Sequence, residues 1–301
     1  MKLELVKPRT SPPISLKELE KVLPKICDKE TSFDPDNWKP DNPFYGHCAV
    51  IALLVQNLLG GKLQYTSLKD SPKFAHMKTH YWNKLDDGTE VDFTKVQFGD
   101  DFSDDLKGKS KTPKSLLSIN SVLNRFKPLA FRLAKALSKN NIIFNDPIYK
   151  ACFYNAIESP CQKMKFGCVI IHNNQIVYEG HNDTMEPLES LCKPECIRFQ
   201  IQSRTDQMLG ACGHAEELGL WAVAKKRIPL DECELYIAGI HPNGLPWIKK
   251  EPEHTCLRCS TQMYNANVEK IFVPVIDKWI GITPKEALDT ALKYATKEKT
   301  V

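Results

Sequence analysis

The stretch that decides the fold of one half of the chain is His214-Ala215-Glu216, with the apolar segment LGLWAVA (218–224) close behind it. About forty residues later the chain reads Cys256-Leu257-Arg258-Cys259. The apolar residues after His214 predict a mostly buried helix. Two cysteines three residues apart predict both sulfurs on one face at the start of a second helix, from about Leu257 to Asn265. Free backbone N–H groups and the helix dipole at such starts favour negatively charged groups.

These residues have the chemistry of a catalytic zinc site. Three protein ligands of the Cys and His type, with a fourth position left for water, are typical of such sites, and His214, Cys256 and Cys259 supply them. Two thiolates and a neutral imidazole cancel the metal charge, so a bound hydroxide and an ionised Glu216 are two negative charges close together. One shared proton relieves this conflict. We therefore expect Glu216 to carry a proton from the attacking water to a substrate ring nitrogen and then to the departing amine.

A closed structural site is the alternative for the same residues, with Cys212 or His254 as a fourth ligand. Glu216 would then be a solvated helix residue. A structural site has no need of a carboxylate two residues after its histidine, so the catalytic interpretation is favoured. A degenerate domain that only binds is a further alternative, but all four catalytic residues are present in the sequence.

The segments around the motif alternate between predicted helices and strands. The predicted order is a helix (DPIYKACFYNAIES, 146–159), a strand (FGCVIIH, 166–172), a turn at Asn173-Asn174, a strand (QIVYEG, 175–180), the His214 helix, a strand (CELYIAGI, 233–240), the Cys256 helix, a strand (KIFVPVI, 270–276) and a helix from about Thr283. This alternation predicts a sheet covered by helices, an α/β three-layer sandwich.

With these motifs, about 150 residues of the chain resemble the cytidine and deoxycytidylate deaminase superfamily, whose zinc-deaminase signature combines H-x-E with C-x-x-C. The resemblance implies a zinc-dependent hydrolase that releases ammonia from a nucleobase. It also implies that Asn182, in Gly180-His181-Asn182, contacts the substrate. The chain departs from the family at Thr255, where Pro commonly precedes the first Cys, and in the length of the segment between Asn182 and Gly213.

That long segment, LCKPECIRFQIQSRTDQMLGACGH (191–214), resembles the insert before the HAE motif of deoxycytidylate deaminases. The resemblance implies phosphate binding by Arg198 or Arg204. A second, structural zinc held by Cys192, Cys196 and Cys212 is an alternative, although only three ligands are visible in the sequence. An ordinary surface loop with buried thiols is the favoured interpretation of these cysteines.

A separate constellation lies in the first half of the chain. Cys48 opens the apolar stretch CAVIALLVQNLLGG (48–61), which predicts a buried helix ending at its two glycines. The segment HYWNKLDDGTEVDFT (80–94) predicts two strands joined at Asp86-Asp87-Gly88, with His80 on the first and Asp92 on the second.

Cys, His and Asp in this order resemble the transglutaminase-like and papain-like thiol enzymes, and the whole region resembles the YunG-like family of small bacterial domains. The resemblance implies Cys48 as nucleophile, His80 as base and Asp92 as the group that orients the base. The alternative is a buried helix-start thiol, a hydrogen-bonded strand histidine and a turn-side aspartate.

Length and composition favour two domains. A chain of 301 residues with 42% hydrophobic content suits a smaller α+β transglutaminase/papain-like domain over residues 1–140 and the zinc domain over residues 141–301. The boundary is predicted between Lys139 and Asn145. The polar region from Gly99 to Lys114 is predicted to be an exposed connection, and the helical stretch from about Pro113 to Ser138 to pack back on the first domain.

The chain is expected in the reducing cytoplasm, because its start, MKLELVKPRT, lacks the apolar core of a signal peptide and no stretch approaches the roughly 18 apolar residues of a membrane span. Its eleven cysteines are then ligands, nucleophiles or core atoms. A formal charge of +4 suits a phosphate-bearing partner but falls short of the basic stripe of a nucleic-acid binder.

A free nucleoside or nucleotide with a cytosine-type base is therefore the favoured substrate. A deaminase that edits a base in single-stranded DNA or RNA, and a non-catalytic nucleotide-binding or sensing protein, are the alternatives. The sequence leaves a homo-oligomer open.

Overall fold

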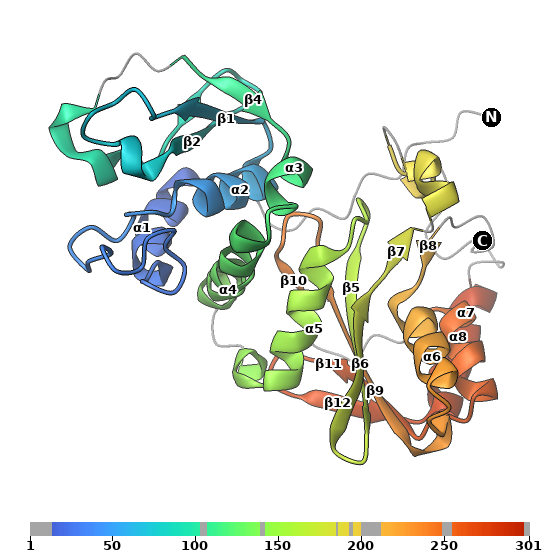
Figure 1. Cartoon of the computed structure of the whole chain (residues 1–301). Coiled ribbons are helices and arrows are strands. Elements are labelled where there is room, and N and C mark those ends of the chain that lie inside the picture. Colours follow the sequence, from blue (N-terminus) through green and yellow to red (C-terminus); the bar gives the residue numbers. More distant parts are fainter. Residues whose placement is uncertain are drawn as a thin grey trace, which may run out of the picture. The chain divides into compact units, whose positions relative to one another are not determined.

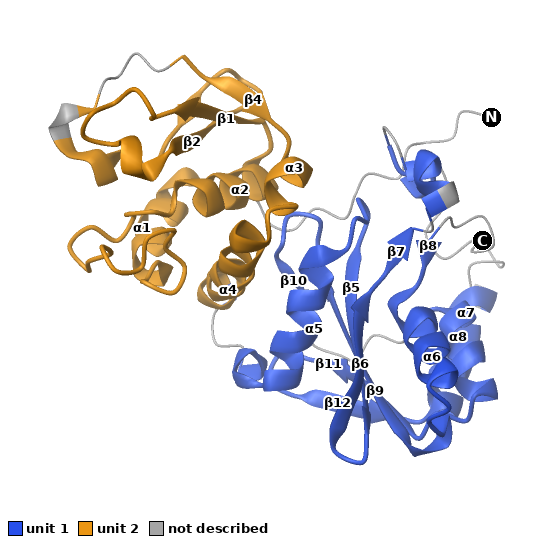
Figure 2. Ribbon diagram, viewed as in Figure 1, with its two compact units in different colours: residues 1–11, 138–301 blue, residues 12–137 orange. Residues whose placement is uncertain are grey.

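The computed structural model describes residues 14–102, 107–138, 142–184, 186–192, 195–199, 212–248 and 255–297. The chain divides into two compact units between Leu137 and Ser138 (Figure 2). We call the described residues before this division the N-terminal unit and those after it the C-terminal unit.

A single mixed sheet forms the middle of the C-terminal unit, with the strand order β12-β11-β9-β5-β6 and the short β10 paired to β9. The strands are β5 (Lys165–His172), β6 (Gln175–His181), β9 (Cys233–Ile240), β10 (Pro246–Trp247), β11 (Lys270–Pro274) and β12 (Trp279–Ile282). The helices are α5 (Pro147–Glu158), α6 (Ala215–Lys225), α7 (Leu257–Asn265) and α8 (Pro284–Lys297). Helix α5 covers one face of the sheet and the other three helices cover the opposite face (Figure 1). The C-terminal unit is therefore a three-layer α/β sandwich.

The strand pairing explains how the two motif helices come to lie on one face. Strand β5 runs antiparallel to both β6 and β9, whereas β9 and β11 are parallel. A parallel pair needs a crossover between its strands, and α7 provides it. Buried residues of α6, α7 and α8, such as Val223, Met263 and Ala287, share one core with Ile170 of β5 and Leu235 of β9.

Helix α5 packs unusually closely on the opposite face. A Cβ atom added to Gly167 of β5 would lie 1.8 Å from the main-chain oxygen of Cys152 in α5. Only glycine fits at this point, because any side chain would push the helix away from the strand. The close approach fixes α5 above the beginning of β5, next to the residues that follow β6.

The N-terminal unit combines helices with a four-stranded antiparallel sheet of order β3-β2-β1-β4. Its helices are α1 (Leu16–Ile26), α2 (Cys48–Leu59), α3 (Pro113–Leu117) and α4 (Asn120–Leu137), and its strands are β1 (Lys62–Ser67), β2 (Thr79–Lys84), β3 (Glu90–Val91) and β4 (Lys109–Lys111). The first eight residues of α2, from Cys48 to Val55, are all buried. Helix α2 contacts β1 and β2, and α4 contacts α1 and α2, so α2 is the centre of this unit.

Two expectations for this unit need correction. The region from Gly99 to Lys114 is not simply an exposed connection, because Lys109–Lys111 form β4 and pair with β1. The stretch from Pro113 to Ser138 is two helices, since α3 ends at Leu117 and α4 begins at Asn120. Lysines on an edge strand keep other strands from adding to the sheet, and they give the strand a loop-like composition.

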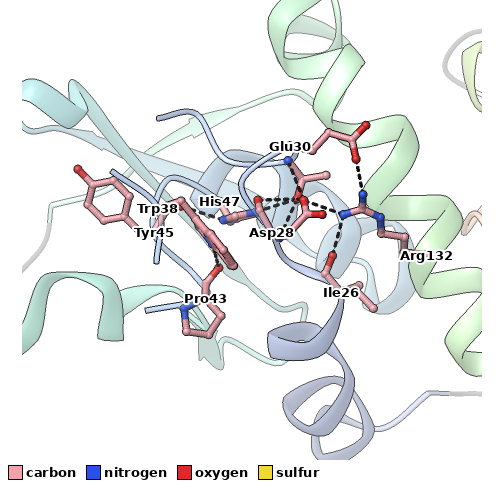
Figure 3. A network of polar contacts seen from close by, with 9 residues as sticks. Ile26, Asp28, Glu30, Trp38, Pro43, Tyr45, His47 and Arg132 are labelled. Carbon is pink, nitrogen blue, oxygen red and sulfur yellow. Dashed lines mark hydrogen bonds and ion pairs between the residues drawn. The ribbon is translucent and has the colours of Figure 1, made fainter. Parts of the chain in front are cut away.

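The loop between α1 and α2 is tied down on both sides (Figure 3). Arg132 of α4 pairs with Asp28 at 2.8 Å and with Glu30, and it donates to the Ile26 carbonyl oxygen at 3.2 Å. His47, the residue before α2, uses both ring nitrogens, at 2.9 Å from Thr31 Oγ1 and at 2.9 Å from the Tyr45 carbonyl oxygen. Burial lowers the pKa of His47 to about 4. The start of α2 is thus anchored by a neutral histidine.

None of the helices in the described parts of the chain combines the length and the apolar character that crossing a membrane requires.

Candidate metal centre

The structure brings the three predicted ligands together at the starts of two helices. His214 is the residue before α6, Cys256 is the residue before α7, and Cys259 lies in the first turn of α7. The His214 Nδ1 atom lies 3.2 Å from Cys259 Sγ and 3.3 Å from Cys256 Sγ. All three ligand atoms lie within 4.8 Å of one another, and no other group of three such residues does so among the described residues. His254, the alternative fourth ligand, lies outside the described residues.

The donor set fits zinc. One imidazole nitrogen and two sulfurs are preferred zinc donors, and three ligands leave a coordination position open. Hydrogen bonds from Cys259 and from His214 lower the pKa of Cys256 to about 4, although burial opposes the shift. Burial and the neighbouring Cys256 raise the pKa of Cys259. One cysteine of the pair is therefore ready as a thiolate, and the second becomes one when a cation offsets its burial.

Glu216 places a carboxyl group in the same helix turn as His214. The side chain is almost fully buried, and burial together with the Cys256 sulfur raises its pKa to about 7, while His214 opposes the shift. Glu216 also raises the pKa of Cys168, so the carboxyl group lies toward β5. A carboxyl group in such a place can hold or release a proton near neutral pH.

Glu217 is a part of the site that the sequence analysis did not identify. One carboxylate oxygen accepts a hydrogen bond from the His214 backbone N–H at 3.1 Å. The other accepts from Arg258 Nε at 2.7 Å and from Gln262 Nε2. Because Glu217 is fully buried and Arg258 lies between the two cysteine ligands, this carboxylate fixes both ligand-bearing helices to each other. Two sequence features could have indicated this contact: the second acidic residue of His-Ala-Glu-Glu and the Arg inside Cys-Leu-Arg-Cys.

Thr255 lies just before Cys256 at the start of α7, at the position where the resemblance leads one to expect Pro. Its hydroxyl lies 2.7 Å from the Ser260 hydroxyl, which also donates to the Thr255 carbonyl oxygen at 3.3 Å. Both residues are buried. The hydrogen bonds hold the turn that presents Cys256.

Asn182 follows β6 directly, and its side chain joins three segments. The Oδ1 atom accepts from Ser159 Oγ at 2.8 Å and from the Phe166 N–H at 2.7 Å, and Nδ2 donates to the Met164 carbonyl oxygen at 3.1 Å. An amide side chain has two acceptor and two donor positions. Three of them are used within the protein, and one N–H of the amide remains.

The insert before His214 lies against the loop after α5. Gln162 donates to the Cys192 carbonyl oxygen at 2.9 Å and accepts from the Cys196 N–H at 3.1 Å. This places Cys161, which the sequence analysis did not include, among the electrostatic neighbours of Cys192 and Cys212. Burial raises the pKa of Cys192 to about 11 and that of Cys212 to about 12. Burial therefore favours the thiol form of Cys192 and Cys212.

Of the two arginines predicted in the insert, one lies among the described residues. Arg198 lies in a short 3-10 helix (Ile197–Phe199), and its carbonyl oxygen accepts from Lys163 Nζ at 3.0 Å. Its guanidinium group opposes the rise in the pKa of Cys212, which lies two residues before His214. Arg204 lies outside the described residues.

The predicted residues of the N-terminal unit also meet. His80 Nε2 lies 2.6 Å from Asp92 Oδ2. Cys48 Sγ donates to the carbonyl oxygen of Thr79, the residue before His80, at 3.7 Å. Cys48 and Asp92 both raise the pKa of His80.

Each of the two parts of the chain matches a family model. Residues 146–275 match the family model described as the cytidine and deoxycytidylate deaminase zinc-binding region, and residues 15–138 match the model described as YunG protein. The chain is thus similar to a deaminase zinc-binding region over residues 146–275 and to the YunG model over residues 15–138. The zinc-binding description of the first family supports Zn²⁺ as the metal of the His214, Cys256 and Cys259 group.

Two individual proteins give further similarity. A deoxycytidylate deaminase of Schizosaccharomyces pombe is 27% identical over 163 residues, which are 52% of this chain and 50% of the relative. The chain thus spans about half the length of that relative. The crystal structure of cytidine deaminase from Burkholderia pseudomallei aligns with a TM-score of 0.31 and 12% identity, over 46% of this chain and 91% of the other.

Proposed function

We propose that the C-terminal unit is a zinc-dependent hydrolytic deaminase of a nucleobase, with the metal held by His214, Cys256 and Cys259. One observation carries the proposal. The three ligand atoms lie within 4.8 Å of one another at two helix starts, and the buried Glu216 is in the same turn as one of them. Bound zinc lowers the pKa of water and so supplies a nucleophile at neutral pH.

The chain's own proton carrier is Glu216. Its carboxyl group is shielded from solvent, so a proton held there passes to the substrate rather than to bulk water. A first proton, taken from the attacking water, goes to the ring nitrogen beside the reacting carbon. A second proton, taken from the hydroxyl group now on that carbon, goes to the departing amine. The products are a ring carbonyl and ammonia.

Glu217 acts on the ligands through position. It fixes the His214 backbone and receives hydrogen bonds from Arg258 and Gln262, which belong to the helix of the cysteine ligands. Groups that hold metal ligands in place affect metal affinity nearly as strongly as the ligands do. Glu217 is therefore a positioning residue of the centre.

The substrate is a free nucleoside or nucleotide, with a cytosine-type base favoured. The similar curated protein is named a deoxycytidylate deaminase, which supports a cytosine nucleotide. The remaining Asn182 N–H suits a sugar hydroxyl group, and Arg198, near the segment leading to His214, suits a phosphate. The small positive net charge of +4 agrees with a compact anionic substrate.

A substrate panel tests the proposal. Ammonia release is measured for the zinc-loaded chain with cytidine, deoxycytidine, their monophosphates, guanine, adenosine and short single strands. We expect release from cytosine nucleosides or nucleotides and none from Glu216→Ala. Release from the strands alone would support nucleic-acid editing and overturn the free-substrate proposal. An inert panel, with one nucleotide raising the unfolding temperature, would support a binding or sensing protein instead.

Arg198→Ala tests the phosphate contact separately. A charge-assisted hydrogen bond contributes about 1.5–3 kcal/mol, so we expect KM for the favoured monophosphate to rise at least about tenfold while KM for its nucleoside is unchanged. Arg227→Ala is a control, because Arg227 is an exposed residue at the end of α6. Equal rises for nucleoside and monophosphate would remove Arg198 from the phosphate site.

A further inference from the structure

A buried histidine in the N-terminal unit has a ring nitrogen without a partner. His80 of β2 is fully buried, and its Nε2 atom lies 2.6 Å from Asp92 Oδ2. Its Nδ1 atom has no hydrogen-bond partner. A buried polar atom left unsatisfied is costly, and such atoms in folded proteins call for an explanation. His47, in the same unit, shows the usual case, since both its ring nitrogens have partners.

The Cys48 thiol lies beside this histidine. Cys48 begins α2, and its sulfur donates to the carbonyl oxygen of Thr79, the chain neighbour of His80. Burial favours the neutral ring, yet the interactions with Asp92 and with the Cys48 sulfur raise the pKa of His80 to about 9. The imidazole thus has the carboxylate on one side and a sulfur as a second polar neighbour.

A helix start and a guanidinium group lie near the Cys48 sulfur. The sulfur is at a helix start, where free N–H groups and the helix dipole stabilise negative charge. The Arg125 guanidinium group of α4 donates to the Gly46 carbonyl oxygen at 3.3 Å and interacts electrostatically with Cys48. Tyr81 is a further neighbour, and its pKa is raised by burial and by Cys48. The groups that face the thiol–imidazole pair are therefore Asp92, Arg125 and Tyr81, and aromatic rings fill the rest of the space around His80: Trp82, Phe98 and Phe102.

A second buried donor without a partner belongs to the same cluster. Gln97 Oε1 accepts from the Gly46 N–H at 3.1 Å, whereas Gln97 Nε2 is buried without a hydrogen bond. Gly46 has φ +75°, and a Cβ atom there would lie 2.4 Å from Ser32 Oγ and 2.9 Å from the Phe33 nitrogen. The turn therefore requires glycine. It holds the Gln97 amide against Gly46, which lies two residues before Cys48 in the sequence.

We propose that Cys48, His80 and Asp92 form a second active site, which cleaves the carbonyl bond of an amide or ester, with Gln97 Nε2 as the donor to the oxyanion. The Cys48 thiolate attacks the carbonyl carbon and forms a C–S bond. His80 Nδ1 gives its proton to the departing amine or alcohol as the C–N or C–O bond breaks. A water molecule then attacks the thioester and gives one proton to His80, so that a carboxylic acid leaves and the thiolate returns.

Carbonyl chemistry fits the cluster better than thiol redox chemistry. Redox exchange needs a second reactive sulfur, and Cys27 is the only other cysteine before residue 138. Burial and Asp28 raise the pKa of Cys27, so it stays a thiol. An N–H donor without a partner, by contrast, suits an oxygen that gains negative charge during the reaction.

Alkylation by iodoacetamide tests the thiol–imidazole pair in the zinc-loaded full chain, with peptide mass mapping as the readout. We expect Cys48 to react at least about tenfold faster than Cys27 at pH 6, because an activated thiol keeps its thiolate well below the usual pKa of about 8.5. In the His80→Gln chain, Cys48 should react no faster than Cys27 at pH 6. Its alkylation rate should return to the wild-type value only above pH 9. Cys27→Ser should leave the alkylation rate of Cys48 unchanged. Equal rates for Cys48 and Cys27, or an unchanged rate in a folded His80→Gln chain, would overturn the proposal.

Acylation by p-nitrophenyl acetate tests the carbonyl chemistry. One equivalent of p-nitrophenol per chain should appear in a burst and leave acetyl-Cys48, and Cys48→Ala should lose the burst. Gln97→Ala should slow acylation by about 10²-fold or more, the usual effect of one oxyanion donor. Its iodoacetamide rate should not change, because alkylation forms no oxyanion. A burst that persists in Cys48→Ala would overturn the proposal, and equal slowing of both reactions would remove Gln97 from it. If His80→Gln does not fold by circular dichroism, Asp92→Asn takes its place.

Discussion

The two halves of the molecule use the same kinds of side chain in opposite ways. In the C-terminal unit the His214 Nδ1 atom faces two sulfurs, at 3.2 and 3.3 Å, and no carboxylate is bonded to the ring. In the N-terminal unit His80 has a carboxylate at Nε2, and its Nδ1 atom is without a partner. A histidine facing two sulfurs suits a soft metal ion, whereas one held by a carboxylate suits proton transfer. The partners of the imidazole therefore distinguish a ligand from a base.

The carboxylates sharpen this difference. Glu216 has burial and a negative sulfur as its main influences, and both favour its protonated form. Asp92 bonds a histidine and, through its other oxygen, the Thr94 hydroxyl and N–H groups, each at 3.0 Å. Three partners hold the Asp92 carboxyl group in the position that orients the imidazole. One carboxyl group is thus arranged to exchange a proton, and the other to keep a histidine in place.

Glu216→Ala gives the largest expected effect. Ammonia release should fall by about 10²–10⁴-fold, the usual contribution of a general acid–base group, while the zinc content stays at one ion per chain. Cys256→Ala should lose both activity and metal. Elemental analysis combined with an ammonia assay measures both quantities. Near wild-type turnover in the Glu216 variant would contradict its role as proton carrier.

The same metal analysis decides the role of the insert cysteines. We expect no second zinc, because Cys192, Cys196 and Cys212 do not form a group of close potential ligands among the described residues. Two ions per chain, with one of them lost in Cys161→Ser, would instead show a structural site. The molecule would then have three cysteine-containing sites to compare: the His214 centre, the Cys48 cluster and the insert.

Glu217→Gln should have an intermediate effect. Loss of the charge leaves Arg258 without its buried partner and weakens the hold on His214. We expect zinc affinity to fall by about 10–100-fold, as measured by competition with a chelator. Glu232→Gln is the matched control, because that glutamate is exposed and pairs only with His172 among its described contacts. An unchanged affinity would make Glu217 a purely structural residue.

Asp92→Asn should have the smallest effect, and it depends on pH. The pKa of His80 in the folded chain is about 9, above its usual 6.5. The protonated ring therefore stabilises the folded state fully below about pH 6.5, and this contribution is lost as the pH rises through 9. We expect the variant to unfold about 5 °C lower at pH 6 and at the wild-type temperature near pH 10.

Thermal unfolding of Asp87→Asn is the control for this measurement. Asp87 is fully exposed, and hydrogen bonds from Thr89 lower its pKa, so it does not titrate between pH 6 and pH 10. If the difference in unfolding temperature between Asp92→Asn and the wild type stays constant across this pH range, Asp92 acts through packing alone.

Sequence patterns were sufficient where the signal is local. Helix α7 covers Leu257–Asn265 as expected, because Cys256 caps it and Cys259 follows within one turn. The three ligands were predicted for the same reason. Strand β4 was missed because its residues, Lys109, Ser110 and Lys111, have the composition of a loop and become a strand only by pairing with β1.

Contacts between distant residues account for the rest. Glu217 meets Arg258 and Gln262 across 41 and 45 positions of the chain, so no local pattern shows that the second glutamate of His-Ala-Glu-Glu holds two helices. The Gln97 contact with Gly46 spans 51 positions. Polar groups that act across such separations depend on the finished packing of the fold.

The Arg132 contacts have a consequence for the time at which the chain acquires its chemistry. Arg132 reaches the Ile26 carbonyl oxygen and Glu30, which lie 106 and 102 positions earlier. During synthesis from the N-terminus, Cys48 leaves the ribosome long before α4 does. The loop that precedes Cys48 can therefore be locked only after α4 has emerged, so this part of the N-terminal unit is completed late in synthesis.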